Sequence, residues 1–423
     1  MISEGGLVED ESFWRNMSEL YSRNEVGISM NIDLGKIKPK SEISKLSRIN
    51  LKSNSDRLYT DLADQRKMIG GILGVGSERL ALTKGSRVSM IFALSSIKWN
   101  SGDHIVLSDQ EHPGTLAALD FMERMYGVCL YQVKIPINHY VTESELVNVF
   151  DNAISNLKRA GKIVRALIWS SPTYRTGLMI PVKKLSQIAR DNSLISICDG
   201  AHLLGMVDFD YSNSGVDFLC GSGHKWQAAP HATGFLVLSE RIVNGDIDLN
   251  RYVPLEVPGI TDEKSVEFSP GSIATRLSAC SGSRVSQFEE LAESCQVWKD
   301  IGQEKIQAYI FSLGSYLKEK ISTRWGVDRL FTPHVGESGL SSGICAFNPF
   351  EDSMDLYDQL KSNTLVRRLA QERGVNLRNV DIASSSQVKT LWPLRINTPV
   401  WLDSGDIDVA LDHIWNLSRK GIS

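Results

Sequence analysis

The sequence predicts an α/β fold in which helices cover both faces of a mainly parallel sheet. Three observations support this prediction. Short apolar runs of strand length alternate with amphipathic stretches between about residues 80 and 240. Proline and capping residues stand where helices would begin, and glycine stands where they would end. Strands that alternate with helices are typical of parallel sheets, because a parallel pair needs a crossover connection.

Local signals predict the individual elements. A helix is expected over 113–126, because proline suits its first turn and Gly127 follows its last. A second helix is expected over 143–159, where Thr142 and Glu145 form a capping box. The other predicted elements are strands at 104–108, 128–135, 165–169, 194–198, 218–220 and 234–238, and helices at 90–97 and 181–191.

Length and patterning predict two domains. A chain of 423 residues exceeds the size at which a single core keeps growing. Residues 71–285 are expected to form the large domain and residues 286–423 a smaller α/β domain. The N-terminal arm, residues 1–70, is assigned to the smaller domain, and one long helical pattern is expected over 287–317.

Composition excludes several classes of partner. The net charge of −4 gives no electrostatic reason to expect nucleic acid or an anionic membrane. Neither a membrane-spanning run nor a signal peptide is recognisable. The six cysteines form no C-x-x-C pair, so neither a disulfide framework nor a metal site is indicated. These features are those expected of a cytoplasmic enzyme.

Two polar motifs follow neighbouring predicted strands. Asp199 opens Asp-Gly-Ala-His, and Lys225 lies in Ser-Gly-His-Lys-Trp. Ligand sites in parallel sheets lie beyond the carboxyl ends of the strands, so both side chains are expected at one site. Pyridoxal phosphate (PLP) chemistry requires this combination. A lysine bonds to the cofactor, and an acid keeps a proton on its ring nitrogen so that the ring accepts electrons.

The order and spacing of the two motifs resemble the class V aminotransferase family of fold-type I PLP enzymes. This family includes cysteine desulfurases, isopenicillin N epimerase-like proteins and kynureninases. The resemblance covers most of the chain and implies the fold-type I fold, with Lys225 as the Schiff-base lysine and Asp199 beside the ring nitrogen. It also implies that His202 lies near the cofactor's phenolate oxygen. Taken alone, Lys225 could be a surface lysine, Asp199 a helix N-cap and His202 a structural histidine.

The resemblance also implies a phosphate cradle. Gly85-Ser86-Arg87 resembles the family's Gly-Thr-Thr turn, with the departure that Arg87 replaces the second small hydroxyl residue. Ser222 and His224 are implied to complete the cradle from the other side. Backbone N–H groups at the start of a helix suit a phosphate. An ordinary capped helix is the alternative.

Four further positions take their roles from the family. His112 is implied to stack on the PLP ring and to assist proton transfer, and a capping residue is the alternative. Thr173 is placed near the cofactor, unless its segment is a plain turn. Gly271-Ser272 resembles an element that reaches the neighbouring subunit's phosphate, which implies a homodimer with shared sites unless it is a simple proline turn. Arg395 matches the arginine that binds the substrate α-carboxylate, and an interfacial ion pair is the alternative.

The motifs most resemble the isopenicillin N epimerase-like branch of the family, and this resemblance implies chemistry at Cα or Cβ of an amino acid or amino-acid conjugate, in a natural-product or sulfur pathway. Desulfurases of the family carry a nucleophilic cysteine shortly before the carboxylate-binding arginine, and residues 361–395 contain none. Cys345 is expected in the core, so cysteine desulfurase activity is disfavoured. β-Elimination and epimerisation are placed ahead of transamination and of decarboxylating or oxidative variants.

Two alternatives come from other functional classes. A regulatory protein with the same fold would be expected to lack Lys225 or Asp199, and both are present. A Rossmann-type nucleotide enzyme needs Gly-x-Gly-x-x-Gly after a strand. The glycines at 70–76 have neither that spacing nor a preceding predicted strand.

Overall fold

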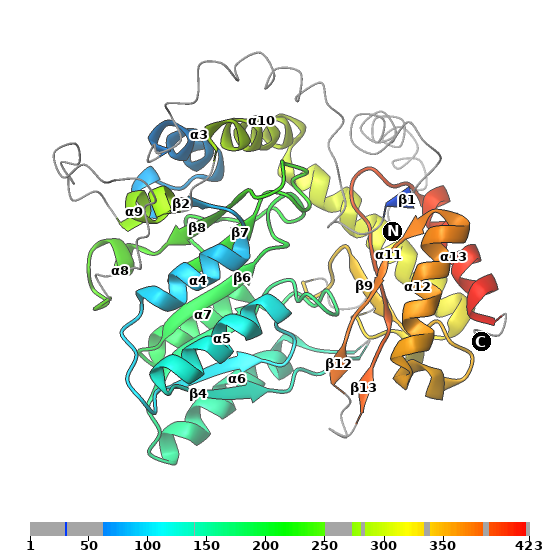
Figure 1. Ribbon diagram of the computed structural model, residues 1–423, viewed down its shortest axis with the longest axis horizontal. Helices are drawn as coiled ribbons and strands as arrows, with labels where there is room; N and C mark the ends of the chain where they lie inside the picture. Colours follow the sequence, from blue (N-terminus) through cyan, green and yellow to red (C-terminus); the bar gives the residue numbers. More distant parts are fainter. Residues whose placement is uncertain are drawn as a thin grey trace.

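A seven-stranded sheet, in the order β2-β8-β7-β6-β5-β3-β4, forms the centre of the molecule (Figure 1). The computed structural model describes residues 30–31, 62–138, 140–249, 273–280, 284–333, 339–383 and 389–419. Only β8 runs antiparallel to its neighbours in this sheet, so the mainly parallel sheet is confirmed. The strands are β2 (Leu80–Thr83), β3 (His104–Ser108), β4 (Cys129–Val133), β5 (Val164–Ser170), β6 (Ile195–Gly200), β7 (Phe218–Ser222) and β8 (Gly234–Leu238).

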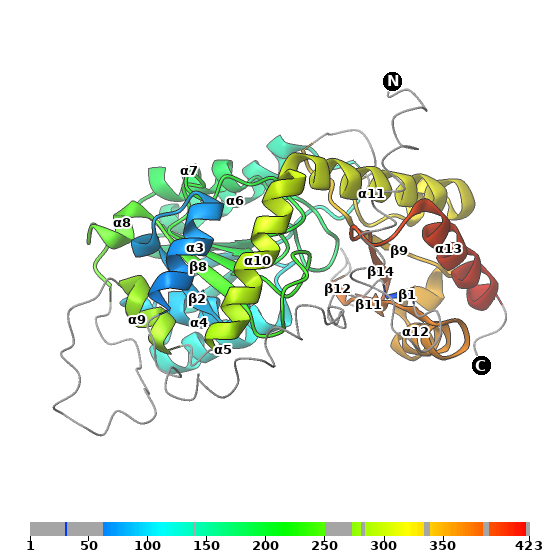
Figure 2. The ribbon, with the colours of Figure 1, turned by 90° about the horizontal axis from the view of Figure 1, so that it is seen from above.

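Helices cover both faces of this sheet. Figure 2 shows α6 (Glu143–Arg159) and α7 (Val182–Asp191) on one side, with α4 (Ser86–Ser96) and α5 (Pro113–Tyr126) on the other. The predicted helix signals are confirmed. Helix α5 ends at Gly127, whose φ of 69° is left-handed, and α6 begins with the complete capping box of Thr142 and Glu145.

Alternate residues of the strands enter two separate hydrophobic cores. Ile105 and Leu107 of β3 belong to the cluster that includes residues of α4 and α5. Val106, between them, belongs to the cluster that includes residues of α6 and α7. Strands that are buried on both faces lack polar alternation, which is why their sequences form continuous apolar runs.

The C-terminal part of the chain forms a second α/β region beside the sheet (Figure 1). Strand β1 pairs with β10 here, so residues 30–31 lie in this region. Its elements are β1 (Met30–Asn31), α11 (Gln303–Trp325), β9 (Ile344–Phe347), α12 (Gln359–Arg373), β10 (Val375–Asn376), β11 (Arg378–Asn379), β12 (Ile382–Ala383), β13 (Thr390–Leu391), β14 (Leu394–Asn397) and α13 (Ser404–Arg419).

The remaining helices are α3 (Ala63–Leu73), α8 (Glu240–Val243), α9 (Ile273–Cys280) and α10 (Val285–Ile301). Helix α3 crosses the predicted boundary at residue 70 and packs against α10 (Figure 2). The exact division into domains therefore stays a prediction. Within the described ranges, no helix has the length and apolar character needed to cross a membrane.

The single helix expected over 287–317 is wrong, because two helices occupy this stretch. Gly302 separates α10 from α11 with a φ of 101°, a conformation that favours glycine. The apolar periodicity continues on both sides of the break, so the pattern alone concealed the change of direction.

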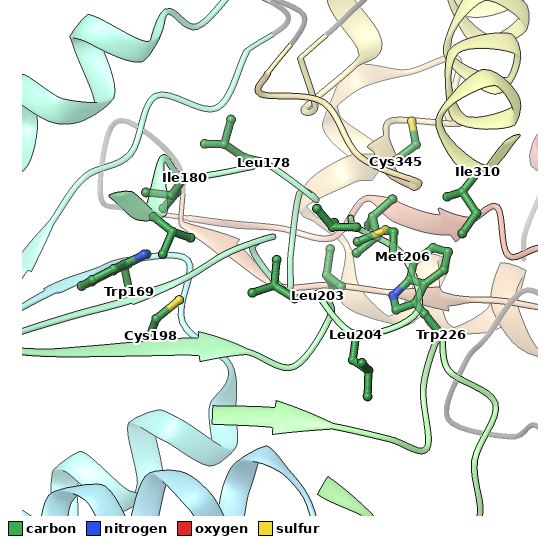
Figure 3. Packing of buried hydrophobic residues seen from close by; sticks show 14 of the residues in the cluster. Trp169, Leu178, Ile180, Cys198, Leu203, Leu204, Met206, Trp226, Ile310 and Cys345 are labelled. Atoms are coloured by element: carbon green, nitrogen blue, oxygen red, sulfur yellow. The ribbon is translucent and has the colours of Figure 1, made fainter. Parts of the chain in front are cut away.

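Helix α11 and the sheet domain share one hydrophobic cluster. Figure 3 shows Trp226 beside Met206, with Ile310 of α11 and Cys345 of β9 close by. A Cβ atom on Gly343 would lie 2.5 Å from Ile310 Cγ2 and 3.0 Å from Trp226 Cη2. The missing side chain at Gly343 therefore lets α11 approach the segment that carries Lys225.

The break at Gly302 can be tested with two glycine variants. Gly302→Ala should lower the free energy of unfolding by about 1–3 kcal/mol, because alanine is strained at positive φ. Gly71→Ala should raise it by about 0.5–1 kcal/mol, because Gly71 is helical and a Cβ there meets no atom within 4 Å. Urea unfolding measures both changes. A stabilising effect of Gly302→Ala would show instead that the helix is continuous.

Candidate active site

A cavity of about 420 Å³ lies at the carboxyl ends of β5, β6 and β7. Its walls bring together most of the predicted site residues and several that were not predicted. The lining residues are Lys84, Gly85, Ser86, Arg87, Val88, His112, Thr115, Ser170, Pro172, Tyr174, Asp199, Ala201, His202, Ser222, His224, Lys225 and Ala232.

Strand register places the two key motifs side by side. Asp199 of β6 pairs with Ser170 of β5 and with Cys220 of β7. Strand β7 ends at Ser222, and Lys225 follows within one turn. Parallel strands end at one edge of a sheet, so the acid of one motif and the lysine of the next face the same cavity.

Asp199 is a buried carboxylate with defined donors. Its side chain accepts hydrogen bonds from the backbone N–H of Ala201 at 3.1 Å and from the Thr115 hydroxyl at 3.3 Å. Burial raises the pKa of Asp199, while the positive charge of Lys225 and the hydrogen bonds oppose this rise. A further cation against this carboxylate would favour its ionised form.

Lys225 and His202 form a neighbouring pair. Lys225 is enclosed by protein apart from its face on the cavity, and this desolvation lowers the pKa of its amine to about 8. Trp226 Nε1 donates to His202 Nδ1 at 2.9 Å, and burial lowers the pKa of His202 well below its usual value. The neutral ring must then carry its proton on Nε2, which lies 3.3 Å from Lys225 Nζ.

His112 both caps α5 and lines the cavity. Its Nδ1 accepts from the backbone N–H of Gly114 at 2.9 Å, and its ring meets the Tyr174 ring edge-on at 4.6 Å. Burial, with the charges of Lys225 and Arg87, lowers the pKa of His112 to about 3. The ring is therefore neutral at pH 7, with its proton on Nε2. The capping alternative is confirmed, whereas the stacking and proton-transfer roles of His112 stay predictions.

Two glycines build the predicted phosphate cradle. Gly85 has a φ of 130°, and a Cβ on it would lie 3.1 Å from His224 Cε1. A Cβ on Gly234 would lie 2.4 Å from Gly85 Cα, so β8 also needs glycine here. The Ser86 N–H at the start of α4 consequently reaches Ser222 Oγ at 3.2 Å. Helix N–H groups and a serine hydroxyl suit a phosphate, so these residues fit PLP.

Arg395 lies beside the cavity behind Tyr174. It is 2% exposed, donates from Nη1 to the Tyr174 carbonyl at 2.8 Å, and has its guanidinium carbon 4.9 Å from the centre of the Tyr174 ring. Tyr174 lines the cavity and Arg395 does not, so the Tyr174 side chain lies between the Arg395 guanidinium and the cavity.

The other predicted positions have different outcomes. Thr173 does not line the cavity, because its hydroxyl accepts from the Leu178 N–H at 3.0 Å and shares a hydrogen bond with Thr176 inside its own turn. Its role near the cofactor stays a prediction. Gly271 and Ser272 lie outside the described residues. No cluster suited to a metal ion occurs among the described side chains.

The sequence analysis gave no role to three residues that shape the site. Thr115 supports Asp199, and Tyr174 joins His112 to Arg395. Glu111 is fully buried and hydrogen-bonded to Ser108 and Ser170, while burial raises its pKa to about 7. Thr115 carried no signal in the sequence, because its role depends on how α5 meets β6.

Comparisons with known proteins agree with this geometry. The family model described as Aminotransferase class-V matches residues 42–349. Isopenicillin N epimerase of Streptomyces clavuligerus is 27% identical over 299 residues, which cover 69% of this chain and 72% of that protein.

Solved structures share the fold. The cystine C–S lyase C-DES, in complex with its reaction product cysteine persulfide, has a TM-score of 0.70 and 18% identity over 92% of this chain and 98% of its own. The apo cysteine desulfurase from Thermococcus onnurineus NA1 has a TM-score of 0.70 and 16% identity over 92% of this chain and 95% of its own. The prediction that disfavoured desulfurases therefore finds no support among these neighbours.

Because the family model matches most of the sequence, this chain belongs to the class V aminotransferase family of PLP-dependent enzymes.

Proposed function

We propose that this enzyme is a lyase that eliminates a β-substituent from an amino acid or amino-acid conjugate. Epimerisation at Cα is the second candidate, ahead of transamination and of decarboxylating or oxidative variants. The observation that carries the proposal is the enclosed amine of Lys225 at one cavity with Asp199, where His112, neutral and with a pKa of about 3, offers no second base.

Each of the main cavity residues has its own role in the proposed reaction. Bound PLP supplies an electron sink for the pair released at Cα. Asp199 holds the proton on the ring nitrogen, and Lys225 removes the Cα proton. With its amine pKa lowered to about 8, Lys225 exchanges protons near neutral pH more readily than an ordinary lysine. When the Lys225 amine is neutral, its lone pair can accept a hydrogen bond from the Nε2–H of His202, 3.3 Å away, which would orient the amine.

The tautomer of His112 favours elimination over epimerisation. A two-base epimerase needs a proton acceptor on the second face of Cα, and His112 Nδ1 is already occupied by the Gly114 N–H. The free nitrogen, Nε2, bears a proton and is a donor. This Nε2–H can donate a hydrogen bond to a departing β-substituent but is too weak an acid to protonate it, and a pKa of about 3 makes His112 a poor base at pH 7. The proton that Lys225 takes from Cα is the one available to the leaving group.

Sulfur-containing substrates stay within the proposal. Desulfurases are among the solved structures of similar fold, and β-elimination breaks a C–S bond without an enzyme thiol. Cys345 is buried in β9, and burial raises the pKa of its thiol to about 12. Such a thiol carries almost no thiolate at neutral pH, so Cys345 is assigned a packing role.

Several predictions from the sequence remain proposals. Arg395 is proposed to bind the substrate α-carboxylate from the family resemblance alone. Because Tyr174 lines the cavity and Arg395 does not, this role requires the Tyr174 side chain to move aside. A homodimer in which Gly271-Ser272 reaches the partner's cofactor is proposed from the family resemblance. The cytoplasmic location stays a prediction.

The reaction type can be tested with purified holoenzyme and a panel of β-substituted and unsubstituted L-amino acids. We expect ammonia and a keto acid from β-substituted members, measured by coupled dehydrogenase assays, and neither product with Lys225→Ala. Lys225→Ala should also lack the covalent cofactor adduct that borohydride fixes in the wild type. Racemised amino acid without ammonia would instead identify an epimerase.

The packing role of Cys345 gives a second prediction. Cys345→Ala should lower the free energy of unfolding by roughly 1–2 kcal/mol through lost contacts, and leave the turnover of folded enzyme nearly unchanged. Turnover with L-cysteine and urea unfolding measure the two effects. Loss of cysteine-dependent sulfide release in this variant, with stability retained, would make Cys345 a nucleophile.

A further inference from the structure

Two exposed cations, Lys84 and Arg87, line the mouth of the active-site cavity. Neither forms an ion pair with an acidic side chain in the part of the chain that the structure describes. Among the described lining residues Asp199 is the only carboxylate, and it is buried and hydrogen-bonded. The mouth therefore carries positive charge that no described lining residue balances.

The Arg87 side chain is directed toward α5. A Cβ atom on Gly114 would lie 2.8 Å from Arg87 Nε and 3.0 Å from His112 Nδ1. The missing side chain of Gly114 thus leaves room for the guanidinium beside the His112 ring. The phosphate cradle is built from other groups, because the Ser86 N–H meets Ser222 Oγ and His224 lies against Gly85.

Arg395 and Arg87 approach the same imidazole through different neighbours. Arg395 stacks on Tyr174, which meets the His112 ring at 4.6 Å, whereas Arg87 lies over Gly114 in the first turn of α5. A substrate held at Arg395 by its α-carboxylate then has a second cation available for the far end of its side chain. A guanidinium recognises carboxylate, sulfonate and phosphate groups through paired hydrogen bonds.

We propose that Arg87, assisted by Lys84, forms an anion subsite that selects amino acids with a second acidic group at the end of the side chain. This proposal rests on the proposed function, because it assigns the α-carboxylate to Arg395. It narrows the substrate class to dianionic amino acids or conjugates. Arg87, which replaces the second small hydroxyl residue of the family's Gly-Thr-Thr turn, would then bind the second acidic group of the substrate.

The test compares matched acidic and neutral ligands on the holoenzyme. The pairs are L-glutamate with L-glutamine, and O-phospho-L-serine with L-serine. Dissociation constants are measured from the change in the cofactor's visible absorption, at low salt. Wild-type enzyme should bind the acidic member of each pair about tenfold more tightly, as expected for one charge-assisted hydrogen bond. This preference should weaken as salt is added, because the subsite is exposed.

Three variants test which residues produce the preference for acidic over neutral ligands. Arg87→Gln should bring the affinity ratio of acidic to neutral ligand close to one, and Lys84→Gln should reduce it less. Gly114→Ala should also lower the ratio, because the new methyl group displaces the guanidinium while the charge is kept. Lys184→Gln removes an exposed cation of α7, away from the cavity, and should leave the ratio unchanged.

The affinity ratio decides between the possible outcomes. An unchanged ratio in Arg87→Gln, or the lack of any preference in the wild type, overturns the subsite. If the ratio is unchanged and the dissociation constant of PLP from apoenzyme rises, Arg87 serves the cofactor phosphate instead. If no amino acid of either kind alters the cofactor spectrum of the wild type, the proposed function itself fails.

Discussion

An acid and an amine held out of bulk water at the ends of adjacent strands set the properties of this cavity. Asp199 lies one residue before the end of β6 with little exposure, and Lys225 follows β7 with its pKa lowered to about 8. Enclosed charges cost free energy unless each has a partner. In the proposed roles, a cationic ring nitrogen at Asp199 and a bond from Lys225 to the cofactor would remove both costs.

The packing between the two regions of the chain reaches the chemistry through Trp226. This side chain is 1% exposed in the cluster that joins the sheet to α11, and its indole N–H fixes the tautomer of His202. His112 is fixed in the same manner by the first turn of α5. In both cases a structural hydrogen bond determines which nitrogen bears a proton, so core packing and proton chemistry are coupled.

Local signals in the sequence were sufficient for six of the seven strands of the sheet, for α5 and α6, and for placing Asp199 and Lys225 after neighbouring strands, whereas β2 was not predicted. They failed at Gly302, because apolar periodicity carries no information about the direction of the next helix. They also gave no role to Thr115 and left the Thr173 hydroxyl unassigned between cavity and turn. Those contacts depend on the distances between elements far apart in sequence. Motif spacing predicts which strand end carries a residue, whereas tertiary packing decides what its side chain touches.

The central claim is that the ionised carboxylate of Asp199 makes the Cα proton of a bound amino acid labile. The most direct measurement is the exchange of that proton in D₂O, followed by NMR, for wild type and Asp199→Asn with matched cofactor content. The variant keeps the shape of the side chain and loses only its charge. Exchange should slow by about 10²-fold or more, the usual scale of a lost acid–base contribution. Wild-type exchange rates in a fully loaded Asp199→Asn enzyme would contradict the account.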